Sequence, residues 1–529
     1  MKEFRKSRLC LLLICLLLLL PKTALAADTI SVQIPNFTVT LNGVQVDQTH
    51  REYPFLVYNN ITYFPMTYYD CRFLGLESNW TERDGLSITK SKISGGYRAY
   101  QQAASNGTGK GYQAEKIDKP VLVNGIVIDN KTEQYPLLRF RNVVYFPLTW
   151  RFAVETFGWD YRFDNKAGLT IQSDNLAAKP LAIQNGYYGS ERGFYQGHFQ
   201  VMKDQLLYLT NDYYLYRMPL NQLQPAQEIS LTLKGNTDSG TVFGAYVNEP
   251  ERNVQIYKAF DGKYYFYCSN GWGNIMGEFG EWVIHDDYTM DGNEVRGGID
   301  GIYQHYPDVD ICIDVSILSV RDKGKYHTYG SSDYYFDYRA PQQYQLIGRN
   351  LYIMASKELF GWGRLCCINL DTDKITEILP EPADCFQIIG NTAYIVNKQN
   401  RLLAVNLTNG TAEDLSITLW QRDTNNSDDK LKYPICVVGN RLYYVKDDRK
   451  LYCLGNDTPL ENANVTNLLG VDGHLVACFE AKAENPCRFL VLNSVGKNIY
   501  RSADVVTAVS IDGNNMVYQS GGQLYFVQF

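Results

Sequence analysis

The acidic stretch 286–292 has residue types that could bind a calcium ion through oxygen atoms. Four of its residues match the first half of an EF-hand loop, namely Asp287, Thr289, Asp291 and Gly292. The bidentate glutamate of such a loop would fall at position 298, which is a glycine. A solvated turn or a weak loop site for calcium therefore fits the stretch better than an EF-hand. We assign no metal ligand here and keep Asp287 and Asp291 as candidate ligand contacts.

Three further carboxylates, Asp308, Asp310 and Asp314, alternate with aliphatic residues and would share one face of a β-strand. Two neighbouring carboxylates could serve as the general acid and base of a glycoside hydrolase. An exposed polar face of a strand explains the same pattern without any chemistry. We therefore name no catalytic residue and favour a binding protein, with an extracellular hydrolase or lyase that acts on a glycan as the alternative.

Three tryptophans, Trp272, Trp282 and Trp362, are candidates for contact with a sugar, because aromatic rings pack well against apolar faces. Trp272 and Trp282 lie among many glycines in the stretch from about 268 to 300. Glycine lets neighbouring aromatic faces sit exposed without steric cost, which favours a ligand surface. The other interpretation is that these tryptophans fill the cores of β-sheets.

Several chemistries lack the residues that they need. The six histidines include no His-x-His pair, and the chain contains neither Gly-x-Ser-x-Gly nor a phosphate-binding loop. We expect no cofactor. The net charge is −7 and no dense basic block exists, so nucleic acid is a poor partner.

The cysteines do not have the spacing of a disulfide scaffold. Of the twelve cysteines, Cys10 and Cys15 fall within the first 26 residues, and no Cys-x-x-Cys occurs. Buried free thiols are expected, since cysteine packs as a small apolar residue. A disulfide such as Cys436 with Cys453 is the alternative.

Residues 1–26 have the organisation of a secretory signal peptide. Met1 to Arg8 carries lysines and arginines, Leu9 to Leu20 is an unbroken apolar run, and Ala24-Leu25-Ala26 provides a cleavage pattern. The run is shorter than the roughly 20 residues that a membrane-spanning helix needs. An uncleaved anchor is the alternative. We expect a secreted or envelope-held chain with no transmembrane segment after cleavage.

The region 30–174 repeats itself. Asn60 to Asp70 reads NITYFPMTYYD, and Asn142 to Phe152 reads NVVYFPLTWRF. Matches at Asn-Gly, Tyr-Pro and Tyr-Phe-Pro share an offset of 82 residues, and the later Gly-Leu-Ser-Ile and Gly-Leu-Thr-Ile share an offset of 83. Each copy reads as a hairpin, strands, a short helix that starts near proline, and a closing strand. We predict two small α+β modules, at 27–92 and 118–174, joined by a linker at 93–117.

This order of motifs resembles the copper amine oxidase-like N-terminal domain, a stalk domain of bacterial envelope proteins. The resemblance covers about residues 30–90 and 118–174. It implies a surface or accessory role in a Gram-positive-type cell envelope, with a cell-wall glycan or a surface protein as partner. It does not imply oxidation, because a copper amine oxidase needs a His-x-His pair and an Asn-Tyr-Asp/Glu cofactor site, and the chain has neither.

A looser repeat follows from about residue 184. Glycine-led hairpin patterns recur at Gly348, Gly390, Gly439, Gly473 and Gly513, at intervals of 42, 49, 34 and 40 residues. A period near 40 with short strands is typical of β-propeller blades. The early segment QLLYLTNDYYLYRMPLN resembles a bacterial extracellular propeller family. We predict a mainly β protein whose stalk-type modules precede a propeller of six to eight blades at 184–529, with an insertion at about 268–340.

We expect the mature chain to begin at Ala27, since the small-x-small pattern ends at Ala26. Mass spectrometry of the N-terminus of the exported protein measures this directly. A chain that starts at Met1 and stays in the membrane fraction would instead demonstrate an uncleaved anchor.

Overall fold

The computed structural model describes residues 29–184, 198–210, 214–229, 253–269, 277–298, 304–314, 317–330, 334–336, 344–358, 363–420, 433–481 and 485–529. The expected signal peptide lies outside the described residues. The chain divides into two compact units, Met1–Ser91 with Arg98–Asp174, and Lys92–Tyr97 with Asn175–Phe529. Among the described residues, no helix is long and apolar enough to cross a membrane.

The two sequence repeats form the first unit, and their elements follow the same order. The first repeat contains β1 (Thr29–Gln33), β2 (Val39–Leu41), β3 (Val44–Val46), β4 (Leu56–Tyr58), β5 (Ile61–Pro65), α2 (Tyr68–Phe73), β6 (Leu76–Thr81) and β7 (Gly85–Lys90). The second contains β8 (Gly111–Lys116), β9 (Val121–Val123), β10 (Ile126–Ile128), β11 (Leu138–Phe140), β12 (Val143–Pro147), the π-helix η1 (Arg151–Thr156), β13 (Asp160–Asp164) and β14 (Gly168–Gln172). Each repeat thus has one helix of six residues, and strands dominate the unit.

The repeats exchange strands, so they are not separate modules. A closed barrel combines three strands of each repeat in the order β1-β4-β5-β12-β11-β8. Two four-stranded sheets also mix them, in the orders β10-β9-β7-β6 and β13-β14-β2-β3. The expectation of two modules joined by a linker at 93–117 is corrected accordingly, because β8 of the barrel begins inside that segment and residues 92–97 belong to the second unit.

A pseudo-twofold axis relates the repeats. In the barrel, Phe64 pairs directly with Phe146, and Ser31 pairs directly with Gln113. The partners in both pairs are 82 positions apart, which is the offset of the sequence repeat. Tyr63, Phe64 and their counterparts Tyr145 and Phe146 are fully buried. The repeated Tyr-Phe-Pro motif therefore pairs with its own copy between β5 and β12, and its two tyrosines belong to the apolar cluster of the barrel.

The repeated glycine of Gly-Leu-x-Ile permits the exchange. β7 pairs in parallel with β9, and β14 pairs in parallel with β2. Gly85 and Gly168 open these strands at φ 74° and 79°. A Cβ atom would lie 2.1 Å from the Pro120 carbonyl oxygen at Gly85, and 2.0 Å from that of Thr38 at Gly168. Only glycine tolerates both the left-handed φ and this approach of backbone to backbone.

A buried ion pair fixes helix α2. Arg51 and Asp70 form it, and their side chains are 2% and 0% exposed. Thr67 caps the helix through its side chain, and its Oγ1 donates to Asp70 Oδ2 at 2.5 Å. The helix start therefore depends on a charge that Arg51 neutralises.

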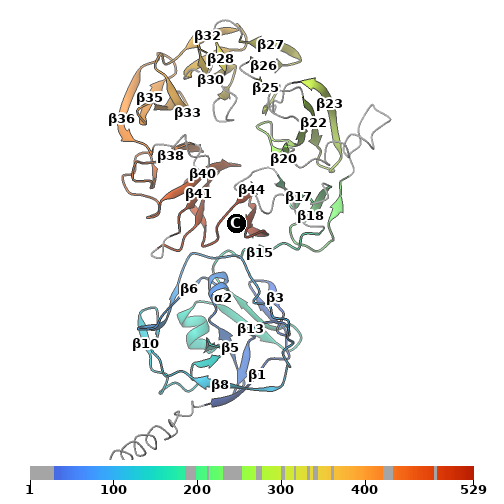
Figure 1. Cartoon of the computed structure of the whole chain (residues 1–529), viewed down its shortest axis with the longest axis vertical. Helices are drawn as coiled ribbons and strands as arrows, with labels where there is room; N and C mark the ends of the chain where they lie inside the picture. Colours follow the sequence, from blue (N-terminus) through green and yellow to red (C-terminus); the bar gives the residue numbers. More distant parts are fainter. Residues whose placement is uncertain are drawn as a thin grey trace, which may run out of the picture. The chain divides into compact units, whose positions relative to one another are not determined.

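The second unit is a β-propeller. Within the described residues it contains eight sheets of antiparallel strands, arranged around a ring with the first strand of each sheet toward the centre (Figure 1). Blades 1 to 4 comprise β16 (Phe199–Met202) to β19 (Gln227–Glu228), β20 (Asn253–Lys258) to β23 (Met290–Gly298), β24 (Gln304–Tyr306) to β27 (Lys325–Tyr329), and β28 (Tyr335–Phe336) to β32 (Lys374–Glu377). Blades 5 to 7 comprise β33 (Ala383–Ile389) to β36 (Ala412–Thr418), β37 (Ile435–Val438) to β39 (Leu451–Cys453), and β40 (Val465–Val471) to β43 (Asn498–Ser502).

The eighth blade closes the ring with strands from both ends of the unit. β44 (Ala508–Asp512), β45 (Asn515–Ser520) and β46 (Gln523–Gln528) are completed by β15 (Lys179–Pro180) on the outer side. Apolar side chains pack between neighbouring blades throughout, as where Phe199 and Val517 share a cluster between blades 1 and 8. The count of eight lies at the upper end of the predicted range.

The glycines of the sequence repeat mark one kind of turn. Gly348, Gly390, Gly439, Gly473 and Gly513 all have positive φ and sit between the first and second strands of their blades. In earlier blades the same turn contains Lys203 at φ 58° and Asp308 at φ 63°. The period is therefore lost in the sequence but not in the fold. The insertion expected at about 268–340 is corrected, since the strands from β22 (Gly277–Ile284) to β28 belong to ordinary blades across it.

We expect Asp70→Asn to destabilise the first unit by about 3–5 kcal/mol, because it leaves the Arg51 charge buried without its partner. Hydrogen exchange of α2 and β5 in the full chain measures the local opening free energy. The control Asp84→Asn removes an exposed pair with Arg83, whose side chain is 88% exposed, and should leave stability nearly unchanged. Equal effects for the two variants would contradict the role of the buried pair.

Candidate functional site

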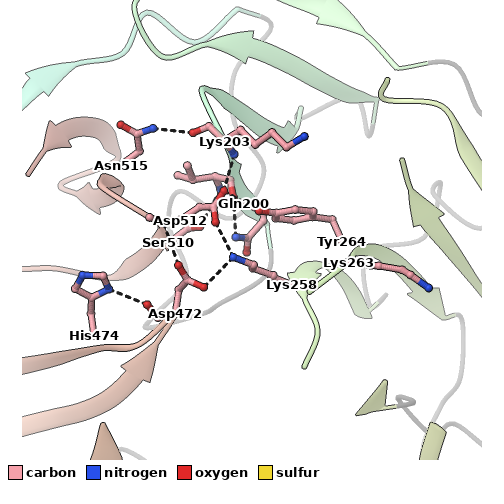
Figure 2. Close-up of polar contacts among 12 residues, drawn as sticks. Gln200, Lys203, Lys258, Lys263, Tyr264, Asp472, His474, Ser510, Asp512 and Asn515 are labelled. Carbon is pink, nitrogen blue, oxygen red and sulfur yellow. Dashed lines mark hydrogen bonds and ion pairs between the residues drawn. The ribbon is translucent and has the colours of Figure 1, made fainter. Parts of the chain in front are cut away.

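A lysine and two aspartates meet where first strands of the propeller end. Lys258 is the last residue of β20, and its Nζ lies 2.8 Å from Asp472 Oδ1 and 2.6 Å from Asp512 Oδ1 (Figure 2). Asp472 is in the turn after β40, and Asp512 ends β44. One lysine of blade 2 thus connects blades 7 and 8. We call this group the Lys258 cluster.

The Oδ2 atoms of the two carboxylates also accept hydrogen bonds. Tyr264 Oη and the Lys203 main-chain N–H donate to Asp512 Oδ2 at 2.7 and 2.6 Å. The Gly513 N–H donates to Asp472 Oδ2 at 3.0 Å. Because Lys203 belongs to the turn after β16, blade 1 joins the cluster as well (Figure 2). Four consecutive blades, 7, 8, 1 and 2, are connected across the point where the ring closes.

These contacts favour the charged forms of both Asp512 and Lys258. Burial raises the pKa of Asp512, but the hydrogen bonds from Lys258, the Lys203 N–H and Tyr264 outweigh it, so the pKa of this carboxyl lies below its ordinary value. Burial lowers the pKa of Lys258, and the two aspartates outweigh burial and raise it. A general acid needs a proton at the working pH, which requires a raised carboxyl pKa. The pKa of Asp512 is lowered instead, so this carboxyl does not suit a general acid. The ion pairs of the cluster connect the blades.

A groove of about 660 Å³ lies over blade 6. Its lining residues are Ile389, Tyr394, Gly439, Asn440, Arg441, Leu442, Leu454, Ser494 and Val495. These residues come from blades 5, 6 and 7. Gly439, Asn440, Ser494 and Val495 lie in turns at the face that also carries the Lys258 cluster, because successive antiparallel strands return every second turn to the same face. We call this the turn face.

The groove combines apolar walls with a cation. A Cβ atom on Gly439 would lie 2.3 Å from the Ser494 carbonyl oxygen, so the repeat glycine lets the turns of blades 6 and 7 approach each other. The Val495 side chain is 67% exposed beside them, and Arg441 is exposed. Concave sites of this size that combine apolar side chains with polar groups are a usual form of a ligand site.

Of the three tryptophans that the sequence proposed as ligand contacts, the structure describes Trp282. Trp282 is 1% exposed and packs with Leu207 and Phe266 in the core between blades 1 and 2. Its assignment to a ligand surface is corrected, because β22 places its side chain on the buried side of the blade. Trp272 and Trp362 lie outside the described residues.

The acidic stretch forms the turn between β22 and β23. Asp287 is exposed, and its Oδ1 accepts from Thr289 Oγ1 at 2.6 Å and from the Thr289 N–H at 3.0 Å. These two bonds lower the pKa of the Asp287 carboxyl. The pattern is that of a turn stabilised by its own side chain. The main chain of Asp291 lies in β23, and its side chain is outside the description.

A histidine that the sequence did not single out links blades 2 and 3. His305 is 5% exposed, with Nδ1 2.8 Å from Asp310 Oδ1 and Nε2 3.1 Å from Glu281 Oε2. Its ring stacks on Tyr265 at 4.0 Å between centroids. Burial lowers the pKa of His305, but the bonds to Asp310 and Glu281 outweigh it and raise the pKa to about 9. The Asp310 carboxylate therefore pairs with His305 inside the protein instead of lying on an exposed face of the strand.

The described cysteines are thiols. The nine cysteines whose side chains the structure describes form no disulfide with one another, and all but Cys367 are buried. Cys436 and Cys453 belong to one apolar cluster without a bond between them. Within the described ranges, no group of three or more histidine, cysteine, aspartate or glutamate side chains is placed to hold a metal ion.

A sequence signal for Asp512 exists in the repeat. It occupies the last position of a first strand, where three other blades carry Ile347, Ile389 and Val438. A charged residue at an otherwise aliphatic repeat position points to a special contact. No comparable signal identifies Lys258, whose turn is longer than those of the later blades.

Comparison with known proteins gives no family. No family model matches the chain, and no curated protein sequence matches it. Among solved structures, the chain is similar to a computationally designed protein, Ika8, at 12% identity and a TM-score of 0.36 over 64% of this chain and 98% of that one. It is similar to BamB from Moraxella catarrhalis at 13% identity and a TM-score of 0.36, over 63% and 93% of the two chains. It is also similar to virginiamycin B lyase from Staphylococcus aureus at 13% and 0.32, over 67% and 99%. The propeller assignment itself follows from the strand order described above.

We expect the stabilising effect of His305 to depend on pH. Its pKa rises from 6.5 to about 9 on folding, so the protonated ring stabilises the folded state fully below about pH 6.5 and loses this effect as the pH rises through 9. The melting temperature of the wild type should exceed that of His305→Gln most at pH 6, and the gap should narrow by pH 9.5. A gap that stays constant over this range would contradict the charged pairing.

Proposed function

We propose that the chain is a binding or scaffold protein that recognises a glycan, a peptide or another protein through the turn face of its propeller. The observation that carries this proposal is the groove over blade 6, with apolar walls and the exposed Arg441 at its rim. Eight packed blades hold this groove on a rigid frame, so a ligand does not have to pay for ordering a mobile surface. Residues in turns on a rigid scaffold are where binding specificity usually resides.

The Lys258 cluster supports binding over hydrolysis. A glycoside hydrolase needs one carboxyl group that stays protonated until it donates its proton. Both aspartates of this cluster pair with Lys258, and further hydrogen-bond donors contact their carboxylates. They suit a frame that must not deform, which favours recognition over an extracellular hydrolase or lyase.

The proposed setting is the cell envelope. It rests on the signal-like segment 1–26 and on the resemblance of the repeats to envelope stalk domains. In this setting the partner would be a cell-wall glycan or a surface protein. The repeats would act as an accessory unit of the same chain.

Binding of the full mature chain to isolated cell walls, and to arrays of their glycans and surface peptides, tests the proposal. We expect Arg441→Ala and Tyr394→Ala to weaken binding about tenfold each, because both side chains line the groove. The melting temperature should stay unchanged in Arg441→Ala, whose side chain is exposed, and should fall in Tyr394→Ala, whose ring also packs on an apolar cluster. Lys325→Ala, an exposed cation on the outer strand of blade 3, is the matched control and should bind as the wild type does. Equal binding by all four proteins would exclude the groove as the recognition site.

A further inference from the structure

The first unit has a pocket of about 380 Å³ that the propeller-based function does not use. Its apolar walls are Met66, Trp80, Leu86, Ile117, Val143 and Val144. Polar side chains surround them, namely Lys116, Asp118, Lys119, Arg139 and Asn142. The Trp80 side chain is 52% exposed, so its ring is accessible to a ligand in this pocket.

The pseudo-twofold axis supplies a natural control for this pocket. Trp80 pairs with Leu86 across β6 and β7, and Phe163 pairs with Leu169 across β13 and β14. Trp80 and Phe163 are therefore equivalent positions. Lys119 stands two residues before β9, as Phe37 stands two residues before β2, so these positions are equivalent too.

The two copies treat this position differently. In one copy, the Phe37 ring packs edge-on against Phe163, with 5.0 Å between centroids. In the other, Lys119 replaces the phenylalanine, and its Nζ lies 5.7 Å from the centre of the Trp80 ring. A flexible ammonium group thus stands where the first copy has an aromatic plug. The exchange of Phe for Lys, opposite an enlarged aromatic residue, accounts for an open pocket in this copy.

The remaining groups define what would fit. Trp80 offers a flat apolar face, and Lys119 beside it offers a positive charge that a carboxylate would satisfy. Arg139 already pairs with Glu115, so its charge is largely compensated. Asp118 and Asn142 are exposed at the rim and provide acceptors for hydroxyl donors. An aromatic acid could use the first two features but lacks the hydroxyl groups that suit the acceptors.

We propose that this pocket binds an acidic sugar residue of a glycan, with the apolar face of the sugar ring on Trp80, its carboxylate at Lys119 and its hydroxyl groups at Asp118 and Asn142. A volume of about 380 Å³ admits one such ring with its substituents. The site lies in the unit that contains the repeats, and it does not depend on the propeller groove. The chain therefore has a second recognition site of its own.

Calorimetric titration of the full chain with tri-galacturonate and with a glucuronate-containing oligosaccharide tests the proposal, with the neutral maltotriose and the aromatic acid indole-3-acetate as comparison ligands. We expect at least one acidic oligosaccharide to bind at least about tenfold more tightly than maltotriose and indole-3-acetate. Failure of both acidic sugars to bind, or tighter binding of indole-3-acetate, would overturn the assignment.

Three variants locate the site. Trp80→Ala should weaken binding of the acidic oligosaccharide at least about tenfold. Lys119→Phe should abolish it while keeping or raising the melting temperature, since it recreates the packing of Phe37 on Phe163 in the other copy. Lys325→Ala removes an exposed cation that lines neither this pocket nor the propeller groove, and it should leave binding unchanged. Undiminished binding by a folded Lys119→Phe variant would overturn the proposal, as would an equal loss of binding in Lys325→Ala.

Discussion

The pairing of β15 with β46 is the contact on which the ring depends. Lys179 lies opposite Phe526 and Pro180 opposite Tyr525, and the Leu181 N–H donates to the Leu524 carbonyl at 2.9 Å. A propeller blade has apolar surfaces on both sides, so every blade requires two neighbours. Without this closure, blades 8 and 1 would each expose a face to water. The Lys258 cluster joins blades 2, 7 and 8 in the same part of the ring and adds charged contacts there.

Much of the propeller could be predicted from the sequence, because its turns require positive φ and glycine meets that need cheaply. The later blades show this at Gly348, Gly390 and Gly439. The prediction of an insertion at about 268–340 was wrong because Lys203 and Asp308 adopt the same turn without glycine. Tertiary packing imposes the positive φ at these turns, and the local sequence does not indicate it. Trp282 was misjudged for the same reason, since its neighbouring glycines indicated exposure while the blade buries it.

The repeats illustrate a different limit. The offset of 82 residues was visible in the sequence and correctly related Phe64 to Phe146. The exchange of strands was not visible, because a strand has the same alternation of side chains whether it pairs within its own repeat or with the other. The candidate site shows the same limit, since Lys258 is more than 200 residues away in sequence from both of its aspartates. Only Asp512, at a position that is aliphatic elsewhere, left a trace.

The exchange of strands between the repeats also sets an order of events during synthesis. β2 pairs with β14, which follows it by about 130 residues. β15 pairs with β46, which follows β15 by about 345 residues. At translation rates of about 5–20 residues per second, these edges wait for seconds and then for roughly tens of seconds before their partners exist. The first unit can therefore complete its barrel and sheets once β14 has emerged, whereas the propeller cannot close before β46 exists. Until then the strand edge that β15 will pair stays open, and an open strand edge can pair wrongly with another chain.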